Sequence, residues 1–267
     1  MKVFVFDAMY CNGCHNCQVA CKDEHVGNEW LPYAKPQPTA GDFWCRVEQT
    51  EHGQTPMVKV EYRPVFGAQN PELAAYAPEV LMDREDGLIV IEPEKAAGRK
   101  DIADKFDGVF WNEELQIPQG CTGCAHLVDE GKLTHCVDLC STGALSFGDL
   151  EEFADVLANA RTVEDVNGNP PAEGTRVYYL NAPRLFLGGE VWDKEADEDI
   201  EGAKVVLSNA DGEVAAVETD DFGDFKIEYL DAGAYQLHIE AEGFAPVDQD
   251  VQLDKSLFLG DFPLVRA

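Results

Sequence analysis

The chain has 267 residues, of which 51 are acidic and 20 are basic, so its formal net charge at pH 7 is −31. This charge disfavours nucleic acid and anionic membrane surfaces as partners, because both would repel the protein. The longest apolar run is far shorter than the roughly 20 residues that cross a bilayer, and no basic segment followed by an apolar one indicates a secretory signal. We therefore expect no direct membrane insertion and a cytoplasmic protein, or one exported together with a partner that carries a signal.

The beginning of the chain is predicted to contain short elements around a group of cysteines. Residues 1–7 alternate and predict a strand, and residues 15–24 predict a short helix that follows the first cysteines. Residues 30–56 are rich in proline, glycine and polar side chains, which indicates a loop with short strands. A further strand is expected at residues 58–62.

The middle of the chain is predicted to alternate between turns and short regular elements. Residues 87–91 predict a strand bounded by turn signals, and residues 121–140 hold a second group of cysteines. Asp149 is a candidate N-cap for a helix that runs to about Ala160, because the acidic residues that follow suit a helix N-terminus. Residues 167–174 form a turn-rich connection.

Beyond about Gly188 the pattern changes to short alternating segments without cysteines. Residues 225–229 and 235–239 alternate apolar with polar side chains, and turn signals separate such segments. Several short strands at this spacing predict an all-β sandwich of antiparallel strands. We place a domain boundary between residues 186 and 187.

Eight of the nine cysteines fall into two groups with the spacing of metal ligands. The first has the C-x2-C-x2-C-x3-C spacing of the bacterial ferredoxin run, in which the fourth cysteine ligates the other cluster of a two-cluster protein. The second is the same motif with its middle spacer lengthened. The two groups are Cys11, Cys14, Cys17 and Cys21, then Cys121, Cys124, Cys136 and Cys140.

The ferredoxin spacing predicts two [4Fe-4S] clusters with crossed ligation. The first cluster would be held by Cys11, Cys14, Cys17 and Cys140. The second would be held by Cys121, Cys124, Cys136 and Cys21. Residues 1–186 are then an α+β ferredoxin-like two-cluster domain, residues 187–267 are the all-β domain, and electron transfer is the expected function.

A structural zinc site is the alternative for each group. Four thiolates around zinc suit the second group alone, whereas the four closely spaced cysteines of the first group would overcrowd one tetrahedral ion. The proline that usually follows the last cysteine of each run is absent, since Lys22 and Ser141 stand there. A zinc-stabilised binding module and a free-standing ferredoxin with a β-domain tail are therefore the competing hypotheses.

The remaining candidate residues have two readings each. Cys45 stands alone and is most simply a small packed hydrophobe. Four histidines near the cysteines either donate hydrogen bonds to cluster sulfurs or are ordinary surface or packed residues: His15, His25, His126 and His135. No nucleophile–base set and no phosphate-binding loop is present, so we expect no catalytic residue in this chain.

The N-terminal part resembles the iron–sulfur subunits of the dimethyl sulfoxide reductase superfamily, and most closely the transhydroxylase branch. The resemblance rests on the two cysteine spacings, on CKDEH at residues 21–25, on CTGCAHL at 121–127 and on RVYY at 176–179. The last 80 or so residues are similar to the carboxypeptidase-regulatory or transthyretin-like β-domain, with GAKVV at 202–206 and DFGDF at 221–225.

The resemblance implies a partner and also reveals a departure. The partner would be a large catalytic subunit with molybdenum or tungsten on two pterin guanine dinucleotides, acting on phenolic aromatics as a transhydroxylase, hydroxylase or catechol dehydroxylase. The transhydroxylase small subunits carry further cysteines that hold a third cluster. Here residues 65–73 and 104–111 contain no cysteine, so we expect the third cluster to be absent.

Overall fold

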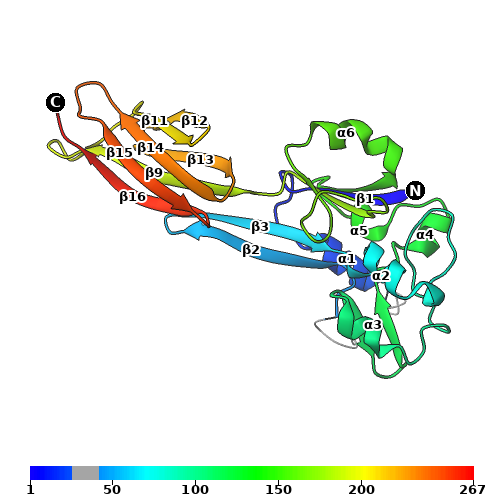
Figure 1. The fold of residues 1–267 in the computed structure, drawn as a ribbon. Coiled ribbons are helices and arrows are strands. Elements are labelled where there is room, and N and C mark those ends of the chain that lie inside the picture. Colours follow the sequence, from blue (N-terminus) through cyan, green and yellow to red (C-terminus); the bar gives the residue numbers. More distant parts are fainter. Residues whose placement is uncertain (26–41) are drawn as a thin grey trace. The chain divides into compact units, whose positions relative to one another are not determined.

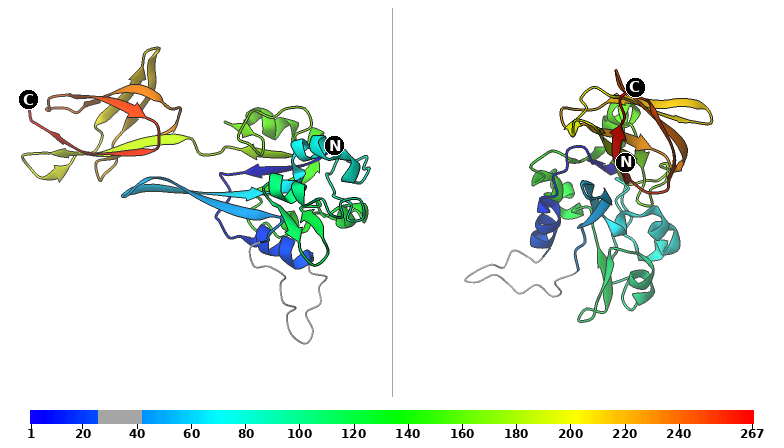
Figure 2. Two further views of the ribbon diagram at one scale, coloured as in Figure 1. Left: turned by 60° about the horizontal axis from the view of Figure 1, so that its bottom comes forward. Right: turned by 90° about the vertical axis from the view of Figure 1, so that its left-hand side faces the viewer.

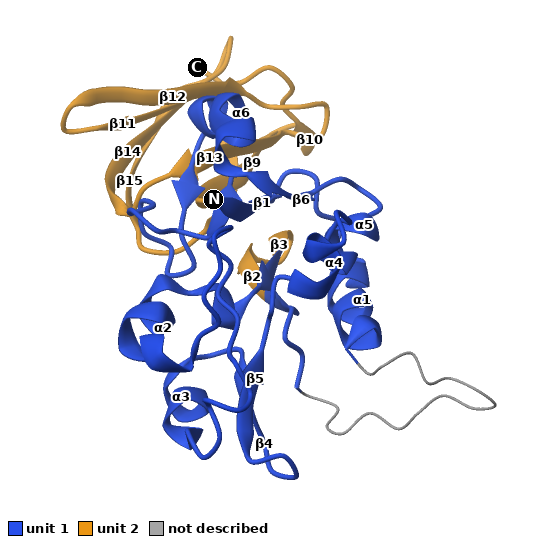
Figure 3. Cartoon of the chain, turned by 90° about the vertical axis from the view of Figure 1, so that its right-hand side faces the viewer, with its two compact units in different colours: residues 1–49, 62–182 blue, residues 50–61, 183–267 orange. Residues whose placement is uncertain are grey.

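The computed structural model describes residues 1–25 and 42–267, which divide into two compact units. The first unit contains residues 1–49 and 62–182, and the second contains residues 50–61 and 183–267 (Figure 3). Part of the predicted loop at residues 30–56 lies outside the described residues. The assignment of residues 50–61 to the second unit could not be anticipated from the sequence pattern.

A four-stranded sheet organises the first unit in the order β6-β1-β8-β7. The predicted N-terminal strand is confirmed as β1, which pairs antiparallel with β6 and parallel with β8. Its alternation gives the sheet two different faces. Val3 and Val5 pack with apolar residues of the segment 150–163, which contains helix α6, whereas Phe4 and Phe6 join the core that contains the cysteines. Figure 1 shows strand β1 next to the N-terminus and helix α6 above it. The strands are β1 (Lys2–Asp7), β6 (Leu145–Asp149), β7 (Val163–Glu164) and β8 (Val177–Leu180).

Short helices, one complete hairpin and the base of a second hairpin complete the first unit. The helices are α1 (Asn16–Glu24), α2 (Pro71–Tyr76), α3 (Lys100–Lys105), α4 (Ala125–Asp129), α5 (His135–Asp138) and α6 (Ala154–Asn159), with 3-10 turns η1 (Gly67–Gln69), η2 (Pro78–Val80) and η3 (Leu150–Phe153). One hairpin pairs β4 (Val109–Asn112) with β5 (Ile117–Gly120). The other pairs β2 (Arg46–Gln54) with β3 (Met57–Val65), so residues 46–54 form one nine-residue strand where the sequence predicted a loop with short strands.

Two predicted elements differ in the structure for identifiable reasons. Residues 87–91 do not form a strand; Ile91 makes only an isolated bridge to Leu81, and the backbone of Ile89 is bonded to a side chain. Asp149 does not cap a helix with its side chain, because its carboxylate accepts a hydrogen bond from Lys2 Nζ at 2.8 Å. The chain after it forms the 3-10 turn η3 before α6 begins at Ala154.

The second unit is formed from β-strands (Figure 2) that make two sheets. The two sheets share one hydrophobic core. One sheet has the order β10-β9-β13 with β16 also on β9, and the other has the order β12-β11-β14-β15. β16 pairs with β9 in parallel, which departs from the expected all-antiparallel arrangement. The strands are β9 (Leu185–Asp193), β10 (Glu198–Asp199), β11 (Lys204–Asn209), β12 (Gly212–Glu218), β13 (Asp224–Leu230), β14 (Gly233–Glu240), β15 (Val247–Leu253) and β16 (Leu257–Leu264).

The predicted alternation in this unit is confirmed in β14 and broken in β13. Tyr235, Leu237 and Ile239 all point into the core, as their spacing predicts. In β13 the register shifts between Ile227 and Leu230. Tyr229 lies in this bulge with φ of 63°, so Leu230 and not Tyr229 is buried.

The tip of the β2–β3 hairpin packs within the second unit through specific contacts. Met57 lies over Gly188 of β9, where any side chain on the glycine would overlap the methionine sulfur. Lys59 Nζ donates to Glu228 Oε1 at 3.2 Å, and Gln54 Nε2 donates to the carbonyl of Phe258 at 3.0 Å. These contacts explain why the tip groups with strands that follow it by more than 120 residues.

Candidate iron–sulfur cluster sites

The first cysteine loop joins β1 to α1 through a left-handed turn. Gly13, between Cys11 and Cys14, has φ of 70°, and a side chain there would overlap the ring of Tyr62. The side chain of Asn12 accepts the Cys14 N–H at 3.2 Å and so stabilises the turn. Glycine is required here because other residues are strained at such a φ.

The second cysteine loop repeats this local geometry before α4. Gly123, between Cys121 and Cys124, has φ of 60°, and a Cβ there would lie 2.7 Å from Leu88 Cδ2. The Gly123 N–H donates to Cys121 Sγ at 3.4 Å. Both loops therefore read C-x-G-C, a shared glycine signal that was present in the sequence and that reasoning from cysteine spacing alone overlooked.

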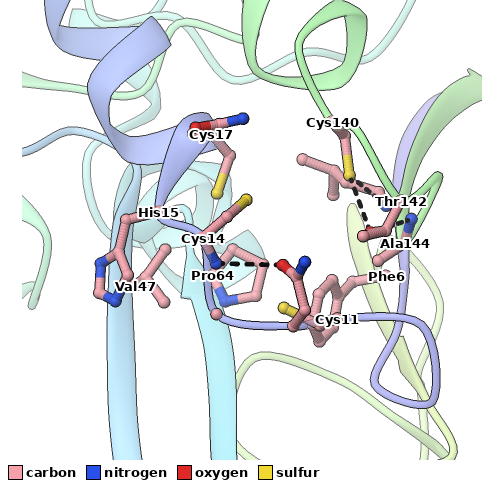
Figure 4. Close-up of a pocket in the computed structure, with 14 residues that line it drawn as sticks. Phe6, Cys11, Cys14, His15, Cys17, Val47, Pro64, Cys140, Thr142 and Ala144 are labelled. Atoms are coloured by element: carbon pink, nitrogen blue, oxygen red, sulfur yellow. Dashed lines mark hydrogen bonds between the residues drawn. The ribbon is translucent and has the colours of Figure 1, made fainter.

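Four cysteines from distant parts of the first unit line one pocket (Figure 4). Apolar side chains, including Phe6 and Leu145, line it with them. Cys14 is exposed and the other three are half-buried. The four are the residues of the first predicted set: Cys11, Cys14, Cys17 and Cys140. Their ligation of a cluster stays a prediction.

The second predicted set of cysteines is buried. Burial raises the pKa of the Cys121 thiol well above its usual range, and neighbouring sulfurs raise it further, namely those of Cys21, Cys136 and Cys124. Burial likewise raises the pKa of Cys124 to about 12. Thiols held together in an apolar region become stable thiolates only when a metal group compensates their charge. All nine cysteines of the chain are free, so none is used in a disulfide.

Cys45 lies between the two sets, which the sequence did not predict. It is 1% exposed, so the expectation of a packed residue is correct as far as burial goes. Hydrogen bonds to Cys136 and Cys17 raise the pKa of Cys45 well above its usual range, and the bond from Cys45 lowers the pKa of Cys17. No spacing rule could have identified this residue, because it stands apart from both cysteine groups, directly before strand β2.

Hydroxyl and amide donors surround the cysteine sulfurs. Thr134 Oγ1 lies 3.6 Å from Cys136 Sγ in a fully buried position. Thr142 Oγ1 lies 3.8 Å from Cys140 Sγ, which also accepts the Leu145 N–H at 3.4 Å. The Thr122 hydroxyl, within the Cys121–Cys124 loop, is buried and has no partner among the described residues.

These observations fit an iron–sulfur group. A cluster requires thiolate ligands, and its sulfurs accept hydrogen bonds from neighbouring donors. The orphaned Thr122 hydroxyl lies beside two such ligands, where a cluster sulfur would satisfy it.

Of the four histidines near the cysteines, one brings its ring close to the sulfur of a candidate ligand. His25 Nε2 lies 3.9 Å from Cys124 Sγ, and its ring packs against Trp44 with centroids 4.5 Å apart. Burial lowers the pKa of His25 to about 4, so the ring is neutral at pH 7. The carboxylate of Glu24 pairs with His126 at 2.8 Å and with His135 at 3.4 Å. His15 instead lies edge-on to Tyr62, 6.0 Å between ring centroids.

Apolar side chains occupy the two segments in which the resemblance places further cysteines. Phe66 and Leu73 come from the first segment, and Phe106 and Val109 come from the second. All four belong to the main core of the first unit and are at most 5% exposed. These segments therefore contribute packing to the fold where the resemblance leads one to expect cysteines.

Comparison with known protein families identifies both parts of the chain. Residues 69–150 match the 4Fe-4S dicluster domain, and residues 187–258 match the carboxypeptidase regulatory-like domain. The region of the second match is mostly β-strand, in agreement with the expected order of the two parts. No helix within residues 1–25 and 42–267 is long and apolar enough to span a bilayer.

A dicluster domain with two groups of clustered thiols defines the class: the chain is an iron–sulfur electron-transfer subunit. It belongs to the family of the pyrogallol hydroxytransferase small subunit, because it is 36% identical to that protein of Pelobacter acidigallici over 96% of each chain. The branch predicted from the sequence is thereby confirmed.

Other members of the superfamily are more distant. The tetrathionate reductase of Salmonella typhimurium has one subunit that is 26% identical over 68% of this chain and 73% of that protein. The anaerobic dimethyl sulfoxide reductase of Escherichia coli has one component that is 28% identical over 56% of this chain and 74% of that protein. Both relatives are named as parts of reductases, consistent with the resemblance on which the superfamily prediction rested.

Proposed function

We propose that this chain carries two [4Fe-4S] clusters and relays electrons for a large molybdenum or tungsten bis-pterin subunit that acts on phenolic aromatics. The relative that covers nearly the whole chain is named for pyrogallol, a phenol, and is itself a small subunit. A small subunit implies a larger partner that supplies the catalytic site. The alternatives remain a zinc-stabilised binding module and a free-standing ferredoxin.

The observation that carries the proposal is the way the thiols sort into two neighbourhoods. Nearby Cys17, Cys14 and Cys140 sulfurs raise the pKa of Cys11, after the larger effect of burial. The pKa of Cys21 is raised first by burial, then by the Cys136 and Cys124 sulfurs of the other group, and least by the Cys17 sulfur of its own group. This grouping, together with the pocket that Cys11, Cys14, Cys17 and Cys140 line, supports crossed ligation, in which each group of cysteines gives its fourth member to the other cluster.

The fold supports two clusters in preference to three. The segments at residues 65–73 and 104–111 supply buried apolar side chains and no thiol. We infer a ferredoxin-like first domain at residues 1–186 and a transthyretin-like sandwich at residues 187–267. The sandwich serves as a docking or shape-completing module in this proposal.

The two neighbourhoods differ in their access to solvent, which suggests separate roles. Cys14 of the first set is exposed, whereas all four cysteines of the second set are buried. A partner can approach the first cluster directly, so we assign electron exchange with the partner to it. The second cluster would exchange electrons through the first, by way of Cys17, Cys45 and Cys136.

Anaerobic purification of the chain together with its partner tests the proposal. We expect brown protein with about eight irons and about eight acid-labile sulfides per chain, as two cubane clusters require, and a large subunit with molybdenum or tungsten. Colourless protein with zinc would establish the binding module. A brown monomer without a partner would establish the free-standing ferredoxin, and about twelve irons per chain would contradict the two-cluster count.

Crossed ligation makes a separate prediction about four single variants. Cys14→Ala and Cys124→Ala each remove a ligand whose cluster is not in doubt, so their residual electron paramagnetic resonance spectra define the loss of the first and the second cluster. Cys140→Ala should then give the Cys14→Ala spectrum, and Cys21→Ala should give the Cys124→Ala spectrum. The reverse pairing would refute the crossing and leave the cluster count intact.

A further inference from the structure

Gln69 is a fully buried polar side chain in the core of the first unit, at the end of η1. Its Nε2 donates to the carbonyl of Ile89 at 2.7 Å and to the carbonyl of Cys121 at 2.8 Å. Its Oε1 accepts the Ile89 N–H at 3.2 Å. One amide therefore joins three segments of the chain, and one of its partners is the backbone of a candidate cluster ligand.

These bonds hold the Cys121–Cys124 loop from two sides. On one side the Cys121 carbonyl is fixed directly. On the other side Gln69 fixes the backbone of Ile89, and the neighbouring Leu88 side chain fills the space against Gly123. Within the loop, Gly123 N–H donates to Cys121 Sγ at 3.4 Å, and this bond depends on the loop keeping its shape.

Packing alone does not account for a glutamine at this position. The surrounding core is apolar, with Phe66, Leu73 and Ile102 all fully buried. An amide in such a place costs about 1–3 kcal/mol unless its groups are hydrogen-bonded, and here both of its polar atoms are. Residues 87–91 form no strand, so the side chain supplies the hydrogen bonds that a neighbouring strand would otherwise give to Ile89.

We infer that Gln69 is a positioning residue for the second cluster. By fixing the Cys121 carbonyl and the segment that carries the Leu88 side chain, it sets the reduction potential and the iron retention of that cluster. The inference rests on the proposed function, since it requires a cluster on the buried thiols. It assigns a specific role to the segment that replaces a cysteine motif. The residue acts through the loop and touches no reacting atom.

The test uses Gln69→Met in the anaerobically purified full chain with its partner. Methionine keeps the shape and removes all three hydrogen bonds, so the loop loosens and the N–H bond to Cys121 Sγ weakens. Such bonds favour the more negative, reduced cluster. We expect the equilibrium constant for reduction of the second cluster to fall about tenfold, which lowers its reduction potential by about 59 mV for one electron. A chelator should remove the iron of this cluster about tenfold faster. The potential and the iron retention of the first cluster should not change.

The matched control is Thr219→Val in the second unit. Thr219 is also buried, and its hydroxyl joins the N–H of Ala203 at 2.9 Å and the carbonyl of Ile200 at 2.6 Å. Its loss should lower the melting temperature and leave both reduction potentials as they are. Equal changes at both clusters in Gln69→Met, or none at either, would overturn the inference.

Leu88→Ala tests the packing of Leu88 against the Cys121–Cys124 loop. This variant tests the inference if the Gln69→Met protein does not accumulate. It removes the side chain that packs against Gly123 and keeps the hydrogen bonds of Gln69. A selective fall in the potential of the second cluster supports the inference, and unchanged potentials overturn it. A wild-type chain without iron and sulfide would instead refute the proposed function, so the two failures are distinguishable.

Discussion

Single residues that bind no cluster still determine the surroundings of the thiols. Cys45 carries one S–H hydrogen, and its sulfur contacts Cys17 of one set and Cys136 of the other. A thiol is a weak donor, and one hydrogen serves only one acceptor at a time. Cys45 is therefore shared between the two sets, and its hydrogen favours whichever sulfur carries more negative charge.

Replacing Cys45 should alter both clusters together. Cys45→Ala removes the donor, so the reduced state of each cluster loses stabilisation of about 1 kcal/mol or less, and both potentials should fall slightly. Cys45→Ser keeps a donor and should recover most of the loss. A redox titration followed by electron paramagnetic resonance measures both values. A change confined to one cluster, or a rise in either potential, would contradict the shared role.

The sequence predicted the candidate ligands better than the residues around them. Cysteine spacing reflects local chain geometry within each group, and the ferredoxin pattern of crossed ligation added Cys140 to Cys11, Cys14 and Cys17. These four thiols line one pocket, and their ligation of a cluster stays a prediction. Gln69 and Cys121 are 52 residues apart in sequence, and Cys45 reaches the thiols from the bend before strand β2. Such contacts depend on how whole segments pack, and no local pattern encodes them.

At the scale of elements, both cysteine loops depend on a left-handed glycine before the second ligand. Gly123→Ala should prevent the second loop from closing, because the new Cβ is strained at φ of 60° and lies 2.7 Å from Leu88 Cδ2. We expect loss of the second cluster with the first retained, measured by iron content and by spectra of the reduced protein.

Gly131→Ala is the control that separates backbone strain from crowding. Gly131 also has a positive φ, 74°, but a Cβ there would meet nothing within 4 Å. This variant should cost about 1–2 kcal/mol from strain alone and keep both clusters. If Gly131→Ala loses the second cluster as readily as Gly123→Ala, crowding against Leu88 is not the cause.

Element predictions succeeded where one face of a strand is buried and failed where a side chain replaces a strand partner. Strand β14 alternates because one of its faces packs into the core of the second unit. Strand β1 alternates because its two faces pack into two different cores of the first unit. Residues 87–91 have the same apolar composition, yet their backbone is bonded to Gln69. The residues of β2 are largely exposed, so the strand shows no apolar periodicity, and only short strands within a loop were expected there.

At the scale of the whole molecule, the excess of acidic residues is the dominant electrostatic feature. The formal charge is −31, and the acids are scattered along the chain. Several arginines lie between two carboxylates: Arg84 contacts Asp86 and Asp129, and Arg46 contacts Glu48 and Asp107. Even so, 20 basic residues cannot balance 51 acidic ones, and the remaining charges repel one another.

Salt should therefore stabilise the protein. Repulsion spread over the surface acts over long distances and is screened as the Debye length falls from about 10 Å at 0.1 M to about 3 Å at 1 M salt, whereas close pairs such as Arg84–Asp86 at 2.6 Å are screened less. We expect the melting temperature of the anaerobic protein to rise with sodium chloride over this range. A variant that neutralises the exposed acids Glu201, Glu213 and Asp221 should have a higher melting temperature at low salt and a smaller increase with added salt. A melting temperature that falls with salt would show that the ion pairs outweigh the repulsion.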